Sequence, residues 1–214
     1  RRSLAVHFYP LPAAVKDDAV EFVLALQPNE SKQLRISLAI SESPEQPNRL
    51  FAKTSVHRDL HAVTQSIRAS CEQWVRRETE FDSDSLLLNR VMRRSLMDLH
   101  MLKTSISGHE FFSAGVPWYV ALFGRDSLIT SLQTLAFWSD TAAATLRLLA
   151  RYQGDQISDW RDEEPGKILH ELRVGELARM NKIPHTPYYG TIDATPLFII
   201  LMSRYVHWSG DLAL

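Results

Sequence analysis

The apolar residues of this chain first alternate with other residues and then take on helical spacing, and this change of period limits the possible folds most. In LRISLAI, every second residue from Leu34 to Ile40 is a branched apolar one, which is typical of a half-buried β-strand. The strand-like runs cover residues 3–12, 19–26 and 33–43. The prolines of SESPEQPNRLF then interrupt the pattern, so we place a domain boundary between residues 56 and 57.

After this boundary the apolar spacing predicts helices. The first spans about residues 58–78, and its apolar face carries Leu60, Val63, Ile67, Cys71 and Trp74. The next follows the segment DSDS, with Asp82, Ser83 or Asp84 as its N-cap. Later helices are expected near residues 127–137, 140–153 and 196–208. The fold class is therefore mainly α, preceded by a few strands.

Composition excludes several classes of function. Lys and Arg number 24 against 25 Asp and Glu, so the net charge of -1 offers no basic surface for nucleic acid or an anionic membrane. The lone Cys71 cannot form an internal disulfide or a cysteine-based zinc site, which favours a cytoplasmic protein. The histidines are scattered, and no metal or cofactor is expected. The first residue is not Met, and the end directly follows a helix; both suggest a piece of a longer protein.

Three loops between the helices are rich in aromatic and charged residues: SAGVPWYVALFGRDS, QGDQISDWRDEEPGKILHE and NKIPHTPYYGTIDATP. Flat aromatic rings beside carboxylates and arginines suit carbohydrates, because sugar C–H faces pack on rings and hydroxyls need paired polar partners. Plainer explanations exist for most of these residues. Asp126 could be a helix N-cap with Arg125 a surface charge, the acidic loop could be solvated, and the tyrosines could simply pack.

Asp193 has no such plain explanation in the sequence. Pro196 suits the first position of a helix, which makes Thr195 the expected N-cap and leaves Asp193 two residues outside. Other motifs can be rejected: HELRV has Val174 where a zinc protease needs its second histidine.

The segments GVPWYVALFGRDSLITSLQTL, DWRDEEPGKILHELRVGELA and PHTPYYGTIDATPLFI resemble the bacterial amylo-α-1,6-glucosidases, the glycogen debranching enzymes. This family is similar to a wider group of inverting glycosidases with an (α/α)6 toroid. The likeness covers most of residues 58–214. It implies that residues 57–214 are the first part of such a toroid, and that residues 1–56 are the last strands of a preceding β-sandwich.

The resemblance also implies roles for single residues. Asp193 matches the general acid, and the Arg125–Asp126 pair matches the residues that hold the sugar in the cleaved subsite. The residues that would contact substrate are Trp118, Tyr119, Arg125, Asp126, Trp160, Arg161, Glu171 and Tyr189. The family's general base belongs to a late helix–loop beyond residue 214, so the chain alone is expected to be inactive. An inverting enzyme needs two carboxyl groups roughly 6.5–9.5 Å apart and a raised pKa on the acid. Tyr188 and Tyr189 could raise the pKa of Asp193 by burying it, although a helix N-terminus would lower it.

The expected function is thus hydrolysis, with inversion, of α-glucosidic bonds in an α-glucan or oligosaccharide, most simply at α-1,6 branches. Alternatives remain open: a trehalase-like hydrolase, a sugar epimerase of the same fold that uses histidines as acid and base, or a glycan-binding module without catalysis. The sequence leaves the linkage and the oligomeric state undecided.

Overall fold

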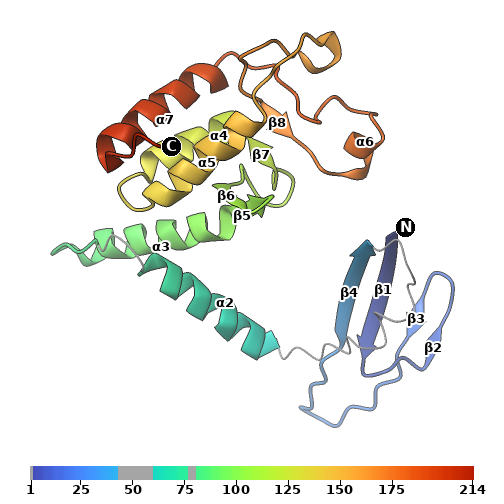
Figure 1. The fold of residues 1–214 in the computed structure, drawn as a ribbon. Coiled ribbons are helices and arrows are strands. Elements are labelled where there is room, and N and C mark those ends of the chain that lie inside the picture. The colour runs from blue at the N-terminus through green and yellow to red at the C-terminus, as the bar shows by residue number, and fades with distance from the viewer. Residues whose placement is uncertain (1, 43–59, 77–80) are drawn as a thin grey trace. The chain divides into compact units, whose positions relative to one another are not determined.

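The computed structural model describes residues 2–42, 60–76 and 81–214, and these fall into two compact units, residues 1–60 and 61–214 (Figure 1). The expected boundary between residues 56 and 57 lies outside the described residues. The described part is mainly helical with small antiparallel sheets, as the sequence predicts. None of the helices in the described ranges combines the length and the apolar character needed to cross a bilayer.

The first unit contains two antiparallel strand pairs. Strands β1 (Arg2–Tyr9) and β4 (Arg35–Glu42) pair over their full length, with Val6 opposite Leu38. Strands β2 (Ala14–Val15) and β3 (Val20–Glu21) form a much shorter pair. The strand expected over residues 19–26 is therefore wrong beyond Glu21, because β2 offers only two residues for it to pair with.

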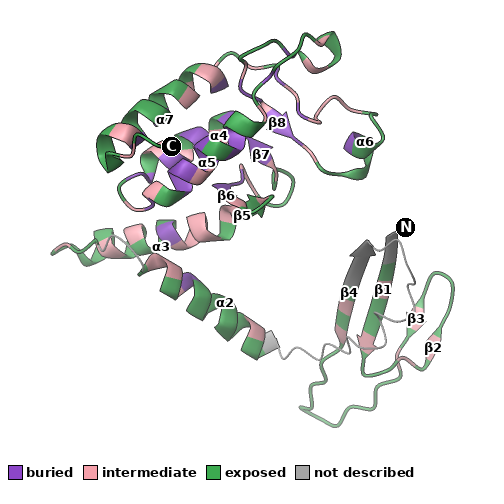
Figure 2. Cartoon of the chain, viewed as in Figure 1, coloured by how far each residue is buried: buried purple, intermediate pink, exposed green. Residues whose placement is uncertain are grey.

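The alternating segment forms strand β4 as expected, but the apolar residues described on it are not half-buried. Ile36 and Leu38 are 59% and 67% exposed, and Leu4 on β1 is 61% exposed. Strand β1 accordingly carries the colour of exposed residues over its middle part (Figure 2). Two strands alone cannot cover their own apolar face, so within the described residues this face stays uncovered.

The second unit begins with α2 (Leu60–Val75) and α3 (Leu86–Leu102). The N-cap of α3 is Ser85, whose Oγ accepts the Leu88 N–H at 3.3 Å, so the expected cap at residues 82–84 is wrong. The earlier polar side chains are engaged elsewhere, because both Asp82 and Ser83 bond to the side chain of Asn89.

A β-hairpin that the sequence analysis missed follows α3. Strands β5 (Lys103–Ile106) and β6 (His109–Phe112) are joined by Ser107 and Gly108, both with positive φ. This two-residue turn is the kind that matches the twist of paired strands, and the Ser-Gly dipeptide could have indicated it.

The remaining elements surround one core. In chain order they are β7 (Leu122–Phe123), α4 (Gly124–Gln133), α5 (Ser139–Arg151), the 3₁₀ helix η1 (Asp159–Arg161), β8 (Glu171–Leu172), α6 (Glu176–Arg179) and α7 (Ala194–Ser209). Helices α4, α5 and α7 contact one another pairwise (Figure 1). The three helices expected here are confirmed, with α4 beginning three residues earlier than expected and α7 two residues earlier.

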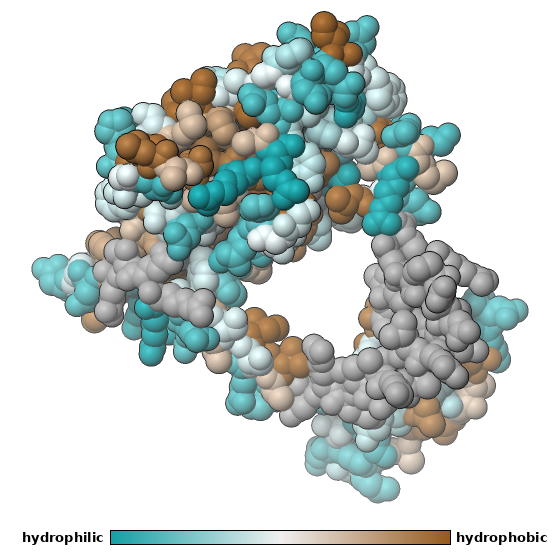
Figure 3. All heavy atoms as spheres, viewed as in Figure 1, coloured by the Kyte–Doolittle hydropathy of each residue, from teal (hydrophilic) through white to brown (hydrophobic). Residues whose placement is uncertain are grey.

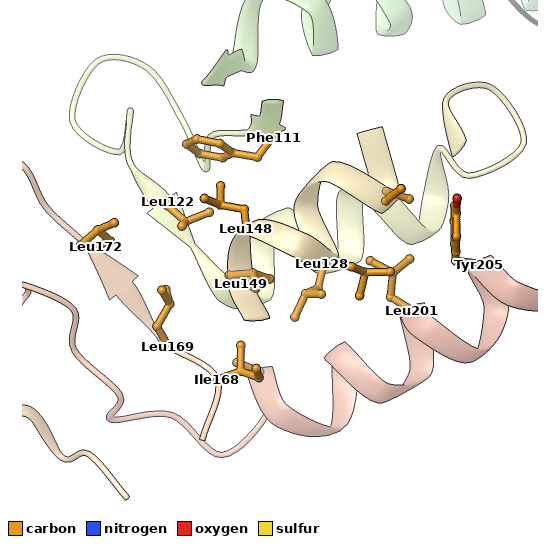
Figure 4. Packing of buried hydrophobic residues seen from close by; sticks show 14 of the residues in the cluster. Phe111, Leu122, Leu128, Leu148, Leu149, Ile168, Leu169, Leu172, Leu201 and Tyr205 are labelled. Carbon is orange, nitrogen blue, oxygen red and sulfur yellow. The ribbon is translucent and has the colours of Figure 1, made fainter. Parts of the chain in front are cut away.

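The core between these helices is apolar and closely packed. Figure 4 shows Leu128 of α4, Leu149 of α5 and Leu201 of α7 facing one another, with Ile168 from the loop before β8 below them. All four are at most 1% exposed. This core holds the N-terminal ends of α4 and α7 in fixed positions relative to each other.

The opposite side of α7 is apolar as well but not covered. Ile199, Ile200, Met202 and Trp208 are all at least 40% exposed. Apolar side chains accordingly lie on the surface over this helix in the space-filling view (Figure 3). The all-round apolar character of α7 in the sequence is therefore only partly used for packing among the described residues.

Candidate functional site

The first turns of α4 and α7 meet at Gly124. A Cβ at this position would lie 2.1 Å from the carbonyl oxygen of Leu169 and 3.2 Å from the Cβ of Ala194. The Gly124 N–H donates to the carbonyl of His170 at 2.9 Å. The glycine of the GRD motif is thus required because backbone from a second segment passes directly against the start of α4.

This close packing brings Arg125 and Asp193 together. The Nη1 of Arg125 donates to Oδ2 of Asp193 at 3.1 Å, across 68 positions of sequence. About half of the Arg125 side chain and a third of the Asp193 side chain remain exposed. Two of the three motifs therefore meet in one polar contact that is open to solvent.

The expected start of α7 at Pro196 is wrong, because the helix begins at Ala194 with Asp193 in the N-cap position. The Asp193 carbonyl accepts the Leu197 N–H at 3.0 Å, and Pro196 is tolerated in the first turn because no helical bond needs its missing N–H. Thr195, the expected cap, instead accepts the N–H of Ile168 on its hydroxyl. The Asp193 side chain makes no capping bond, so its carboxylate is available for other contacts.

The environment of Asp193 favours the charged form. The hydroxyl of Thr191 donates to Oδ1 and lowers the pKa of Asp193 most; partial burial opposes this, and Arg125 lowers the pKa further. The expectation of a raised pKa is therefore wrong for Asp193 in this structure. Thr191 was not among the residues expected at the site, although a hydroxyl two residues before a carboxylate is a common local donor.

Asp126 lies in the first turn of α4, as its third residue. The N-cap position belongs to Phe123, so capping does not explain Asp126. Its carboxylate lies near the positive end of the helix dipole, which favours a negative charge there.

The loop before β7 presents two aromatic rings to solvent. Trp118 and Tyr119 are 77% and 56% exposed. Reciprocal backbone hydrogen bonds between Gly115 and Tyr119 close the loop, and the Tyr119 ring meets Phe123 edge-on at 6.0 Å. Exposed rings on a closed loop next to the start of α4 are available for stacking.

The acidic loop behaves differently from the expectation. Trp160 in η1 is exposed, but Arg161 is paired with the buried carboxylate of Glu163. Glu163 also accepts the N–H of Asp155 at 3.2 Å. Arg161 is thus engaged in holding the loop together, and the solvated-loop explanation fails for Glu163.

Tyr189 belongs to the core. It is 3% exposed, and its hydroxyl donates to the carbonyl of Tyr152 at 2.8 Å. Burial and nearby Glu163 raise the pKa of Tyr189 to about 12, so the phenol stays neutral. The expected contact of Tyr189 with substrate does not fit this burial, and packing explains the residue.

Glu171 is also nearly buried, at 7% exposed, and ion-paired with Arg173, a residue that the sequence analysis missed. Arg173 also donates from Nη1 to the carbonyl of Trp118 at 2.8 Å. Glu171 and Arg173 are two residues apart on an extended segment, so their side chains share one face. This spacing could have indicated their ion pair from the sequence.

Two histidines lie beside Tyr188, whose hydroxyl donates to Asp162 at 2.6 Å. The ring centroids of His170 and His185 lie 6.1 and 5.3 Å from the ring centroid of Tyr188. The His170 ring also meets the Phe123 ring edge-on. Within residues 2–42, 60–76 and 81–214, no three His, Cys, Asp or Glu side chains are grouped to hold a metal ion.

Comparison of the chain with models of known protein families and with curated proteins gives no match. The likeness to the debranching enzymes therefore stays a prediction that rests on the three motifs.

Proposed function

We propose that this chain forms the sugar-binding and acid-bearing side of an inverting glycoside hydrolase that acts on α-glucosidic bonds, with α-1,6 branches of an α-glucan as the first candidate substrate. The observation that carries the proposal is the contact between Arg125 and Asp193. It joins two motifs that resemble the debranching enzymes, and it lies at the meeting point of two helix N-termini.

In this proposal Arg125 and Asp126 bind hydroxyls of the sugar in the cleaved subsite. A guanidinium offers several donors in a planar fork and suits neighbouring hydroxyl oxygens, and a carboxylate accepts from the sugar O–H groups. Trp118 and Tyr119 stack on the C–H faces of the sugar, which their exposure permits. Trp160 is a further stacking candidate. Glu171 and Arg161 are instead held in ion pairs, with Arg173 and Glu163 respectively.

Asp193 is the proposed general acid, and its lowered pKa must be reversed on binding. Thr191 and Arg125 stabilise the carboxylate, whereas burial favours the neutral acid. When sugar hydroxyls engage Arg125 and cover the site, the stabilisation of the carboxylate by Arg125 weakens and its burial increases, and both changes raise the pKa of Asp193. We therefore expect the pKa of Asp193 that governs kcat to lie above the one that governs kcat/KM, because the first reports the complex and the second the free enzyme. The same acid pKa in the pH profiles of kcat and kcat/KM would contradict this change of pKa on binding.

The fold that accompanies this proposal is part of an (α/α)6 toroid formed by the helices of residues 57–214. In the sequence it follows the last strands of a β-sandwich. The pairwise packing of α4, α5 and α7, with polar loops gathered at one end, is compatible with such an arrangement. We assign no general base among the described carboxylates. The two most buried, Glu163 and Glu171, are both paired with arginines.

The test is to express the full-length gene product and to follow glucose release from trehalose, isomaltose, panose and maltose, recording which anomer forms first. An inverting enzyme acting on α-glucosides releases β-glucose first. Initial release of α-glucose would contradict the proposal. Cleavage of trehalose alone would favour a trehalase, interconversion of N-acylhexosamines an epimerase, and binding without turnover a glycan-binding module.

A further inference from the structure

Arg173 contacts three parts of the candidate site with one side chain. Its Nε donates to Glu171 on β8, and its Nη1 donates to the carbonyl oxygen of Trp118 at 2.8 Å. Its guanidinium also lies 5.5 Å from the ring centroid of Phe123, the residue directly before α4. Strand β8, the aromatic loop and the start of α4 are therefore joined at this one planar group.

Arg173 is itself held in place from the other side. Its backbone N–H donates to the carbonyl of His185 at 2.8 Å, and Glu171 also lies 3.6 Å from the His185 ring. Only 9% of the Glu171 side chain is exposed, so this carboxylate is a fixed partner. The His185 carbonyl holds the Arg173 backbone and the buried Glu171 carboxylate holds the guanidinium, which in turn can fix what it binds.

What it binds is the loop that carries the aromatic rings. The Trp118 indole is exposed, and the hydrogen bonds between Gly115 and Tyr119 tie the loop only to itself. The bond from Arg173 reaches the Trp118 carbonyl from 55 residues away in the sequence. This bond holds the backbone from which the indole projects, alongside the edge-on contact of the Tyr119 and Phe123 rings.

We propose that Arg173 is a positioning residue that anchors the Trp118 loop to β8 and thereby sets the surface on which a sugar ring stacks. The stacking part rests on the proposed function, whereas the anchoring part does not. Arg173 does not touch the sugar in this arrangement; it acts through Trp118.

The experiment compares Arg173→Ala and Arg173→Lys with wild type in the full-length gene product, with isomaltose as the probe. Arg173→Ala removes the anchor and should weaken isomaltose binding about tenfold, the order expected for a lost charge-assisted hydrogen bond. Arg173→Lys keeps one charge but cannot span Glu171 and the Trp118 carbonyl at once, so a smaller loss is expected. Arg151→Lys, at an exposed position near the end of α5, is the matched control and should bind as wild type does.

Two further readouts separate positioning from general damage. In a double-mutant cycle, Arg173→Ala should add nothing to Trp118→Ala, because both changes remove the same stacking surface. Hydrogen exchange at the amides of residues 118–121 should become faster in Arg173→Ala without any sugar, while the amides of α5 stay protected.

Each outcome decides one part. The anchoring role would be overturned if the affinity losses of Arg173→Ala and Trp118→Ala multiplied in the double variant. It would also be overturned if the amides of residues 118–121 exchanged in Arg173→Ala at the wild-type rate. If Arg173→Ala does not fold, the exchange rate in Arg173→Lys decides instead, and wild-type protection there would overturn the proposal. If wild type does not bind isomaltose but the loop exchanges faster in the variants, the anchor stands and the proposed function fails for this sugar.

Discussion

The middle and the N-terminal ends of α4 and α7 differ sharply although they belong to the same two helices. In the middle, Leu128 and Leu201 are 1% and 0% exposed and form the core. At the ends, Arg125 and Asp193 are open to solvent and contact each other. The stabilising part and the proposed chemical part of each helix are thus separated along its axis, so changes at the two places should have different consequences.

The largest effect should come from a change at the end that leaves the middle intact. Asp193→Asn keeps the shape of the side chain, but the amide cannot donate a proton to the leaving group. Cleavage of substrates with a sugar alkoxide leaving group should therefore slow by about 10²–10⁴-fold. A glucosyl fluoride needs little protonation and should be affected far less. Kinetics of the full-length gene product with both substrates, together with its melting curve, test this.

Equal slowing of both substrates would make Asp193 a binding or structural residue. A melting temperature well below that of wild type would do the same. The acid would then have to be sought among Asp162, Glu163, Glu164 and Glu171.

The next effect should come from the middle. Leu201→Ala leaves a cavity between α4, α5 and α7, and should lower the free energy of unfolding by about 2–5 kcal/mol. Ile199→Ala on the same helix is the matched control: Ile199 is 57% exposed, so the change should stay within about 0.5 kcal/mol. Urea unfolding curves measure both, and similar losses for the two variants would remove the distinction between the faces of α7.

A smaller effect is expected for Arg125→Lys, which keeps the charge at the end of α4 but loses the planar fork. In the full-length gene product we expect kcat/KM to fall about tenfold to a hundredfold, or about 1.4–2.7 kcal/mol, with the fold intact. Steady-state kinetics test this, with Arg151→Lys as the control. Wild-type kinetics would reduce Arg125 to a surface charge.

The smallest effect concerns the pH dependence of stability. The pKa of Asp193 is lowered in the folded state, chiefly by Thr191, so its stabilising contribution is present above the unfolded pKa of about 3.9. It is lost as the pH falls through the lower folded value. Because about a third of the side chain is exposed, screening limits the contribution to less than about 1 kcal/mol. The stability difference between wild type and Asp193→Asn should therefore shrink below pH 3.9, and a difference that grows there would contradict the assignment.

Much of the architecture followed from periodicity, because spacing reports which residues share a face. It predicted β4 and the five longer helices among the described residues but not the short α6. It also did not predict that Ile36 and Leu38 would be exposed, since burial depends on what covers a face. The N-cap of α3 was misplaced by the competing bonds of Asn89. The start of α7 was misplaced because Pro196 fits anywhere in a first turn.

The candidate site was less predictable than the fold. The motifs brought Arg125 and Asp193 to attention, but their direct contact depends on packing around Gly124 that no local pattern encodes. The sign of the pKa change was wrong because the neighbouring hydroxyl of Thr191 outweighs burial. Arg173 was missed because it acts through a backbone carbonyl, which carries no signature in side-chain types.

The tight contact at Gly124 also bears on how such a site can diversify. Since a side chain there would collide with the backbone at Leu169 and crowd the Cβ of Ala194, the close spacing of the two helix ends tolerates no residue larger than glycine at this position. Selection cannot retune that spacing by small side-chain changes. New substrate preferences should therefore arise through the loop that carries Trp118 and Tyr119, whose exposed rings can be exchanged without moving either helix. In a library of functional variants, position 124 should stay glycine while positions 118 and 119 vary with the sugar selected.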